Sequence, residues 1–181
     1  MRKFSIYFGL MLILLFASCN KKRRECEKFV EKNLDNSFME FKNLAIGIRS
    51  YNRKNFLNPF ITEDYIAVLI TFFDSSYIDS TRKNIGYRLN LNMETGKVLN
   101  DNYESINKYL PLSKKEKLDS VASCFFKYSI AYIAYLPSND LLVALQEQEH
   151  SDLIRTKNVS RYEKKHKLSH IKQDWYQIIW E

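Results

Sequence analysis

The chain has 181 residues, of which 28 are Lys or Arg and 21 are Asp or Glu, giving a formal net charge of +7. Six of the basic residues lie at positions 2–3 and 21–24, so the rest of the chain is close to neutral. A nucleic-acid-binding protein is expected to carry a basic face or stripe, and too little charge remains to form one. The chain has only four glycines, which argues against the glycine-rich loops that cradle phosphates.

The first nineteen residues have the layout of an export signal. A cationic head at residues 2–3 precedes an apolar run at residues 4–16, and the small residues Ala17 and Ser18 lead directly to Cys19. The apolar run is shorter than the roughly 20 residues that a membrane-spanning helix needs. Its length fits the core of a secretory signal.

Residues 15–19, Leu-Phe-Ala-Ser-Cys, resemble the lipobox of a bacterial lipoprotein precursor, although that family usually has Leu in place of Phe16. The resemblance implies cleavage between Ser18 and Cys19, with acyl chains such as palmitate attached to Cys19. Two or more acyl chains anchor stably, since each buried CH₂ contributes about 0.8 kcal/mol. The resemblance also implies a place in the cell envelope. Because Asn20 is not the Asp that signals inner-membrane retention, we expect an outer-membrane lipoprotein facing the periplasm.

Four basic residues, Lys21, Lys22, Arg23 and Arg24, follow the cysteine. Near a bilayer they would attract anionic headgroups at about 1 kcal/mol each, while a solvated spacer is the alternative interpretation. Positive charges after an apolar run resist translocation, so a signal-anchored protein that faces the cytoplasm is a second possible topology. We expect a signal peptide at 1–18, a lipidated basic tether at 19–24 and a single globular domain at 25–181.

The first half of that domain predicts one helix and a sheet. Apolar residues at helical spacing predict an amphipathic helix over 25–35. The pattern can continue as a helix to residue 48, but residues 45–51 fit a strand equally well. Residues 65–73 have the apolar composition of a central strand, and residues 85–93 alternate as a half-buried strand does. A turn at 94–97, with Gly96 at positive φ, leads to a return strand at 98–99.

The second half predicts a long helix followed by strands. A short helix is expected over 102–109. Ser113 and Glu116 form a capping box for a helix that reaches Tyr128. Strand-like runs then occupy residues 129–136, 141–145, 153–156 and 175–180, with a turn at 137–140 and a polar segment rich in Lys and His before the last strand. The pattern is that of an α+β fold, with helices packed on an antiparallel sheet.

Two cysteines remain once Cys19 is lipidated. Exported proteins tolerate disulfides, so Cys26 and Cys124 could pair. Two cysteines alone do not define a disulfide framework, and we expect two free thiols.

Few residues point to chemistry. Glu147, Glu149, His150 and Asp152 form a cluster that combines acids with an imidazole, and burial can separate the pKa values of such carboxylates for acid–base work. A solvated turn between two strands has the same composition. His166 and His170 would share one face of a helix, but no third ligand is close in sequence, so we expect no metal and no cofactor.

The aromatic residues near the end of the chain allow two interpretations. Trp175, Tyr176 and Trp180 could line a sugar- or lipid-binding cleft, but Trp175 and Tyr176 would point to opposite faces of a strand. We expect them to pack in the core. The sequence therefore predicts a membrane-anchored envelope lipoprotein whose domain binds a ligand or partner. An envelope hydrolase, with a site built from residues distant in sequence, is the alternative.

Overall fold

The structure is a computed structural model that describes residues 21–53, 63–73, 86–99, 104–105, 112–146 and 150–180. An N-terminal helix occupies residues 21–32 of the described chain. The elements that follow are η1 (Met39–Phe41), β1 (Leu44–Asn52), β2 (Tyr65–Phe72), β3 (Gly86–Asn92), β4 (Glu104–Ser105), α2 (Leu112–Lys127), β5 (Tyr132–Tyr135), β6 (Leu141–Ala144), β7 (Leu153–Arg155), α3 (Ser160–Glu163), β8 (Lys167–Lys172) and β9 (Trp175–Ile179).

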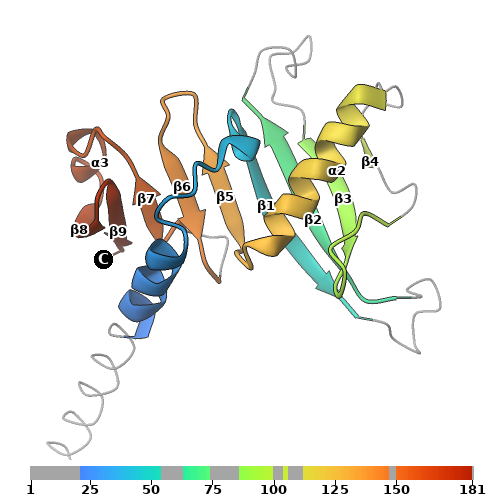
Figure 1. Cartoon of the computed structure of the whole chain (residues 1–181), viewed down its shortest axis with the longest axis horizontal. Coiled ribbons are helices and arrows are strands. Elements are labelled where there is room, and N and C mark those ends of the chain that lie inside the picture. The colour runs from blue at the N-terminus through green and yellow to red at the C-terminus, as the bar shows by residue number, and fades with distance from the viewer. Residues whose placement is uncertain are drawn as a thin grey trace, which may run out of the picture.

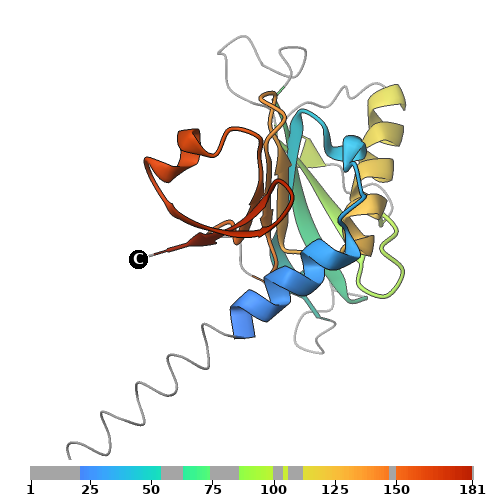
Figure 2. The ribbon, with the colours of Figure 1, turned by 60° about the vertical axis from the view of Figure 1, so that its left-hand side comes forward.

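The strands form one antiparallel sheet in the order β4-β3-β2-β1-β5-β6-β7-β9-β8. Helix α2 crosses β1, β2 and β3 on one face, and the N-terminal helix lies near β6 and β7 (Figure 1). Seen from the side, β8, β9 and α3 curl away from the side that α2 covers (Figure 2). The prediction of an α+β fold with helices packed on an antiparallel sheet is therefore confirmed.

The core lies between the helices and one face of the sheet. Directly opposed residues of antiparallel strands point to the same face, and the register pairs Ile46 with both Ile70 and Ile133. All three side chains are fully buried. Helix α2 adds Leu118 and Phe125, two turns apart on its inner face, to the same buried cluster. Each large apolar side chain buried in this way contributes about 1.5–3 kcal/mol.

An aromatic cluster joins the N-terminal helix to the other half of the sheet. The fully buried indole of Trp175 in β9 meets the ring of Phe29 edge-on, with 6.0 Å between centroids. Phe38 packs against both rings. The core role predicted for Trp175 is confirmed, and Tyr176 is half-buried on the opposite face. Trp180 lies beyond the end of β9 and remains 39% exposed, so the core role predicted for it is wrong.

Several local predictions hold and others fail. Residues 44–52 are a strand rather than an extension of the first helix, and Gly96 has φ 67° as the turn required. Residues 104–105 form β4, which pairs with β3, where a helix was expected; the rest of 102–109 lies outside the described residues. The polar segment before the last strand contains α3 and β8. Strand β8 forms because β9 supplies a partner, which local sequence does not reveal.

The basic segment at 21–24 is helical and contacts the body of the protein. The Lys22 Nζ lies 2.7 Å from the Asp152 Oδ1. Arg23 pairs with Glu27 one turn further along and donates to the Ser169 Oγ of β8 at 3.1 Å. Residues 21–24 thus extend the first helix of the domain, whose start was expected at residue 25. Within the described residues, no helix is long and apolar enough to cross a membrane.

Candidate functional site

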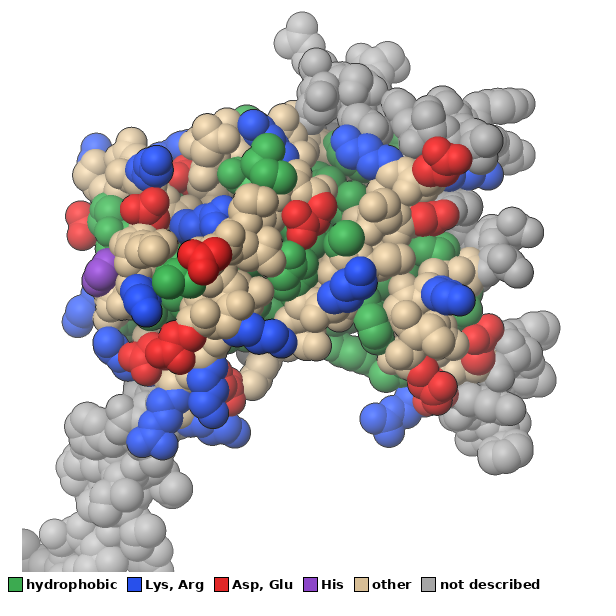
Figure 3. Space-filling view, viewed as in Figure 1, with side chains coloured by type: hydrophobic (Ala, Val, Ile, Leu, Met, Phe, Trp, Pro, Cys, Tyr) green, Lys and Arg blue, Asp and Glu red, His purple; other side chains and the backbone are tan. Residues whose placement is uncertain are grey.

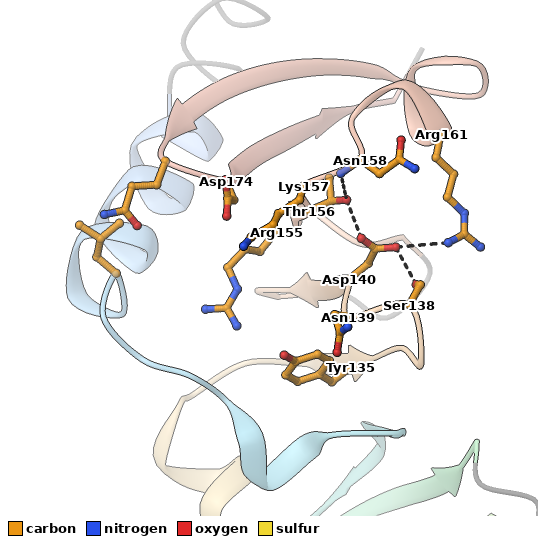
Figure 4. Close-up of a pocket in the computed structure, with 12 residues that line it drawn as sticks. Tyr135, Ser138, Asn139, Asp140, Arg155, Thr156, Lys157, Asn158, Arg161 and Asp174 are labelled. Atoms are coloured by element: carbon orange, nitrogen blue, oxygen red, sulfur yellow. Dashed lines mark hydrogen bonds and ion pairs between the residues drawn. The ribbon is translucent and has the colours of Figure 1, made fainter.

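A polar cavity of about 570 Å³ opens beside the turn between β5 and β6. It is lined by Leu34, Tyr135, Ser138, Asn139, Asp140, Arg155, Thr156, Lys157, Asn158, Arg161, Gln173 and Asp174. These residues come from the turn after the N-terminal helix, the end of β5 and the β5–β6 turn, β7 with the segment after it, α3 and the β8–β9 turn (Figure 4). In Figures 1 and 2 this turn lies at the upper end of the molecule, while the described chain starts at the lower end.

Asp140 is the most connected residue of the polar cavity. The turn that precedes it is closed by a hydrogen bond from the Leu136 amide to the Asp140 carbonyl, and Asn139 takes φ 64°. The Asp140 side chain is buried, and its Oδ1 accepts a hydrogen bond from the Thr156 hydroxyl at 2.5 Å. Its Oδ2 accepts from the hydroxyls of Ser138 at 2.7 Å and Tyr162 at 2.8 Å.

The surroundings keep Asp140 ionised. Burial alone would raise the pKa of the carboxyl, but the three hydroxyl donors and the Arg161 guanidinium, 3.4 Å away, lower it below its usual range. The Tyr162 hydroxyl has its pKa raised to about 12, because it is buried and donates to this carboxylate. A carboxylate with a lowered pKa and occupied lone pairs is a poor general acid and a poor general base. Asp140 therefore joins the β5–β6 turn to β7 and α3.

Arg155 closes the wall of the polar cavity. Its guanidinium donates to the carbonyl oxygens of Asn36 at 2.7 Å and Ser37 at 3.0 Å, which connects β7 to the segment after the first helix. The same group lies over the rings of Phe38 and Trp175, with 5.3 and 5.4 Å to the ring centroids. Arg155 thus has a packing role, and the exposed Lys157 and Arg161 provide cations that a ligand can reach.

A second cavity, of about 400 Å³, lies at the other end of the sheet. It is lined by Ile48, Tyr51, Ile66, Met93, Phe125, Phe126, Ser129, Ile130, Ala131, Leu145 and Gln146. We call it the apolar cavity, because all of these residues except Ser129 and Gln146 have apolar or aromatic side chains. Its walls are the ends of β1 and α2, the start of β2 and the segments that flank β5 and β6.

The predicted acid–imidazole cluster is only partly described, because Glu147 and Glu149 lie outside the described residues. The His150 ring stacks on the indole of Trp180, with 4.4 Å between centroids. Asp152 is buried, pairs with Lys22 and accepts a hydrogen bond from the Leu145 amide at 2.8 Å. His150 and Asp152 therefore have separate partners.

The other two histidines do not share a helix. His166 lies between α3 and β8 and meets the Trp180 ring edge-on, whereas His170 lies in β8 and its Nε2 is 2.8 Å from the Gln173 carbonyl oxygen. Among the described residues, no group of three or more His, Cys, Asp or Glu side chains is arranged to hold a metal ion. Cys26 and Cys124 are free thiols, as predicted.

Neither cavity was predicted from the sequence. Asp140 was recognised as part of a turn, but its hydroxyl partners Thr156 and Tyr162 are 16 and 22 residues away. The one local signal was an Asp at the end of a Pro-Ser-Asn-Asp turn, because Asp in a turn often accepts nearby hydrogen bonds. Comparisons of the chain with profiles of known protein families, with curated proteins and with solved structures find no match.

Proposed function

We propose that the protein is an exported lipoprotein, anchored through acyl chains on Cys19, whose residues 21–181 form a single binding domain on the periplasmic face of the outer membrane. The order of cationic head, apolar run and Ala-Ser-Cys supports export and lipidation. The fixed position of the basic turn, residues 21–24, supports a defined orientation of the domain on the membrane.

The ion pair between Lys22 and Asp152 carries this proposal. Asp152 is buried in the body, so the pair at 2.7 Å fixes the basic turn to the sheet rather than leaving it as a flexible spacer. Cys19 is two residues before Lys21, so its acyl chains would draw this end of the domain toward the bilayer. Lys and Arg side chains gather around the lower end of the first helix (Figure 3). Each contributes about 1 kcal/mol of attraction near an anionic surface.

Two of the four cations are available for headgroups. Lys22 and Arg23 have acidic partners, whereas the exposed Lys21 and Arg24 form no ion pair within the described part of the chain. Anionic headgroups would thus meet Lys21 and Arg24 first. Binding through these two residues would weaken as salt rises, since exposed charges are screened over about 10 Å at 0.1 M salt.

The lowered pKa and the occupied oxygens of Asp140 favour a binding role over hydrolysis. Hydrolases that use two carboxylates need one with a raised pKa to act as the acid. The polar cavity offers Asp140 and Asp174, but the pKa of Asp140 is lowered and its oxygens already accept hydrogen bonds from Ser138, Thr156 and Tyr162. The polar cavity has the size of a small-molecule site, and it lies at the end of the domain away from the basic turn.

Metabolic labelling tests the anchor. Cells expressing the full chain are grown with an alkyne analogue of palmitate, and the wild type is compared with Cys19→Ser and with the matched control Cys26→Ser. Label is expected on the wild type and on Cys26→Ser, and not on Cys19→Ser. Equal labelling of all three would refute lipidation at Cys19. A periplasm-active reporter fused after Glu181 should be active, and an inactive fusion would instead support the cytoplasm-facing topology.

A further inference from the structure

We propose that the apolar cavity binds the acyl chain of a single-chain anionic lipid, with the headgroup held at the basic turn. The biological setting of this inference rests on the proposed membrane location, but the binding itself is a property of the folded domain. Its support comes from the chemistry of the walls, the size of the cavity and its position beside the N-terminal helix.

The walls suit a hydrocarbon chain. Phe125 and Phe126 of α2 line the apolar cavity together with Ile48 of β1 and Ile66 of β2. None of the described residues that line it is charged. A ligand pocket of this kind is usually lined by apolar and aromatic groups, with a few polar groups that fix orientation. Here the polar groups are Ser129 and Gln146, which are both exposed. A sugar or a peptide would find few hydrogen-bonding partners inside.

The volume fits one chain. A methylene group occupies a volume similar to that of a liquid water molecule, about 30 Å³, so about 400 Å³ holds roughly a dozen methylene groups. Each methylene group that moves from water into an apolar environment makes binding more favourable. A lipid with two chains would leave one of them in contact with water. The size of the cavity therefore favours a lysophospholipid or a fatty acid.

The apolar cavity adjoins the basic turn through a direct contact. Gln146 lines the cavity, and its Nε2 donates a 2.8 Å hydrogen bond to the Glu25 Oε2 of the N-terminal helix. Residues four apart share one face of a helix, so Lys21 lies one turn before Glu25 on that face. The ends of β1, α2 and β6 lie at the same lower end of the molecule as the start of this helix (Figures 1 and 2).

The rim combines an amphipathic aromatic residue with positive charge. Tyr51 lines the apolar cavity and is 62% exposed, and tyrosine is a common residue at membrane–water interfaces. The cations at 21–24 outnumber the acids beside them, Glu25, Glu27 and Asp152. An anionic headgroup at the level of the basic turn would meet this positive balance while its chain occupied the cavity.

Photocrosslinking on the full chain tests the inference. The protein is reconstituted in vesicles with lysophosphatidylglycerol that carries a diazirine near the end of its chain, and crosslinked peptides are mapped by mass spectrometry. We expect saturable crosslinks within residues 125–131 and 145–146. Lysophosphatidylcholine with the same chain is expected to crosslink there several-fold less, because its headgroup has no net charge.

Three variants distinguish binding of the lipid's acyl chain from binding of its headgroup. Leu145→Trp fills the cavity and is expected to reduce these crosslinks at least fivefold. The matched control is Leu142→Trp, since Leu142 is half-buried on the other face of the sheet. This control should leave the crosslinks unchanged. If Leu145→Trp fails to fold, the surface double variant Lys21→Gln with Arg24→Gln still decides the matter. It should abolish the preference for the anionic lipid.

Three results would overturn the inference. They are crosslinks spread evenly over the surface, crosslinking that Leu145→Trp leaves intact, and equal crosslinking by the two lysolipids. Labelling of Cys19, measured on the cells from which the reconstituted protein is purified, keeps the two proposals apart. Unlabelled Cys19 with saturable cavity crosslinks refutes the anchor only, and labelled Cys19 without cavity crosslinks refutes the lipid site only.

Discussion

Replacement of Asp140 by Asn removes a charge without a change of shape, so it measures how strongly this carboxylate holds the C-terminal part of the sheet together. The Asn side chain can keep one oxygen toward Ser138 and Tyr162, which places its amide toward the Thr156 hydroxyl. Two hydrogen bonds then lose their charged acceptor, and the bond donated by the Thr156 hydroxyl at 2.5 Å is lost.

The expected cost follows from these three bonds. A hydrogen bond to a charged group contributes about 1.5–3 kcal/mol and a neutral bond about 0.5–1.5 kcal/mol. Arg161 adds little, because its side chain is 56% exposed and the pair is screened by water. The free energy of unfolding is therefore expected to fall by about 3.5–6 kcal/mol at pH 7, measured by urea denaturation of the full chain with an unchanged m value.

The effect of Asp140→Asn should also depend on pH. The pKa of Asp140 is lower in the folded protein than its usual value, about 3.9 for an unperturbed Asp. Stability from a lowered pKa is complete above the unfolded value and is lost as pH falls through the folded value. The difference between wild type and variant should thus be constant between pH 6 and 7 and shrink below about pH 4. A loss under 0.5 kcal/mol, or a difference that persists undiminished at pH 3, would refute this role.

Three further predictions concern the rest of the fold. Burial and the neighbouring Asp152 raise the pKa of the Cys26 thiol to about 12. Cys26 should therefore resist reaction with maleimide at pH 8 until urea unfolds the protein. Labelling of Cys26 in the folded Cys124→Ser variant would contradict this. Lys22→Met should lower the free energy of unfolding by about 1 kcal/mol, since it leaves Asp152 buried without its ion-pair partner. An unchanged free energy of unfolding in a urea titration would argue against a fixed basic turn. Tyr128→Phe should cost about 1–2 kcal/mol, because the Tyr128 hydroxyl has hydrogen-bond partners on both sides; an unchanged unfolding midpoint would refute this.

The parts of the fold that follow local pattern were predictable. Strand β2 carries buried residues on both of its faces, and β3 alternates because one of its faces meets solvent, as the exposed Arg88 shows. Residues 25–32 of the first helix and the α2 helix also follow their apolar spacing. These elements depend on residues close in sequence, so periodicity reports them directly.

The parts that depend on distant residues were not predictable. Local sequence predicts a tether at 21–24, whereas the basic turn is helical and held by Asp152 and Ser169, more than 120 residues away. Strand β8 has a bulge between His170 and Lys172 that interrupts its alternation. Both cavities combine side chains from segments far apart in the chain, and no local spacing signals them.

Fluorescence quenching in vesicles shows which end of the domain lies next to the bilayer. A bimane fluorophore is attached either at Tyr51→Cys, at the end of the molecule where the basic turn lies, or at Asn139→Cys, at the opposite end. Each full chain also carries Cys124→Ser. The labelled proteins are reconstituted in vesicles whose lipids carry nitroxide headgroups. Both positions are exposed, so their intrinsic access to solvent is matched. Strong quenching is expected at position 51 and little at position 139. Equal quenching at both positions, or stronger quenching at position 139, would contradict the proposed orientation.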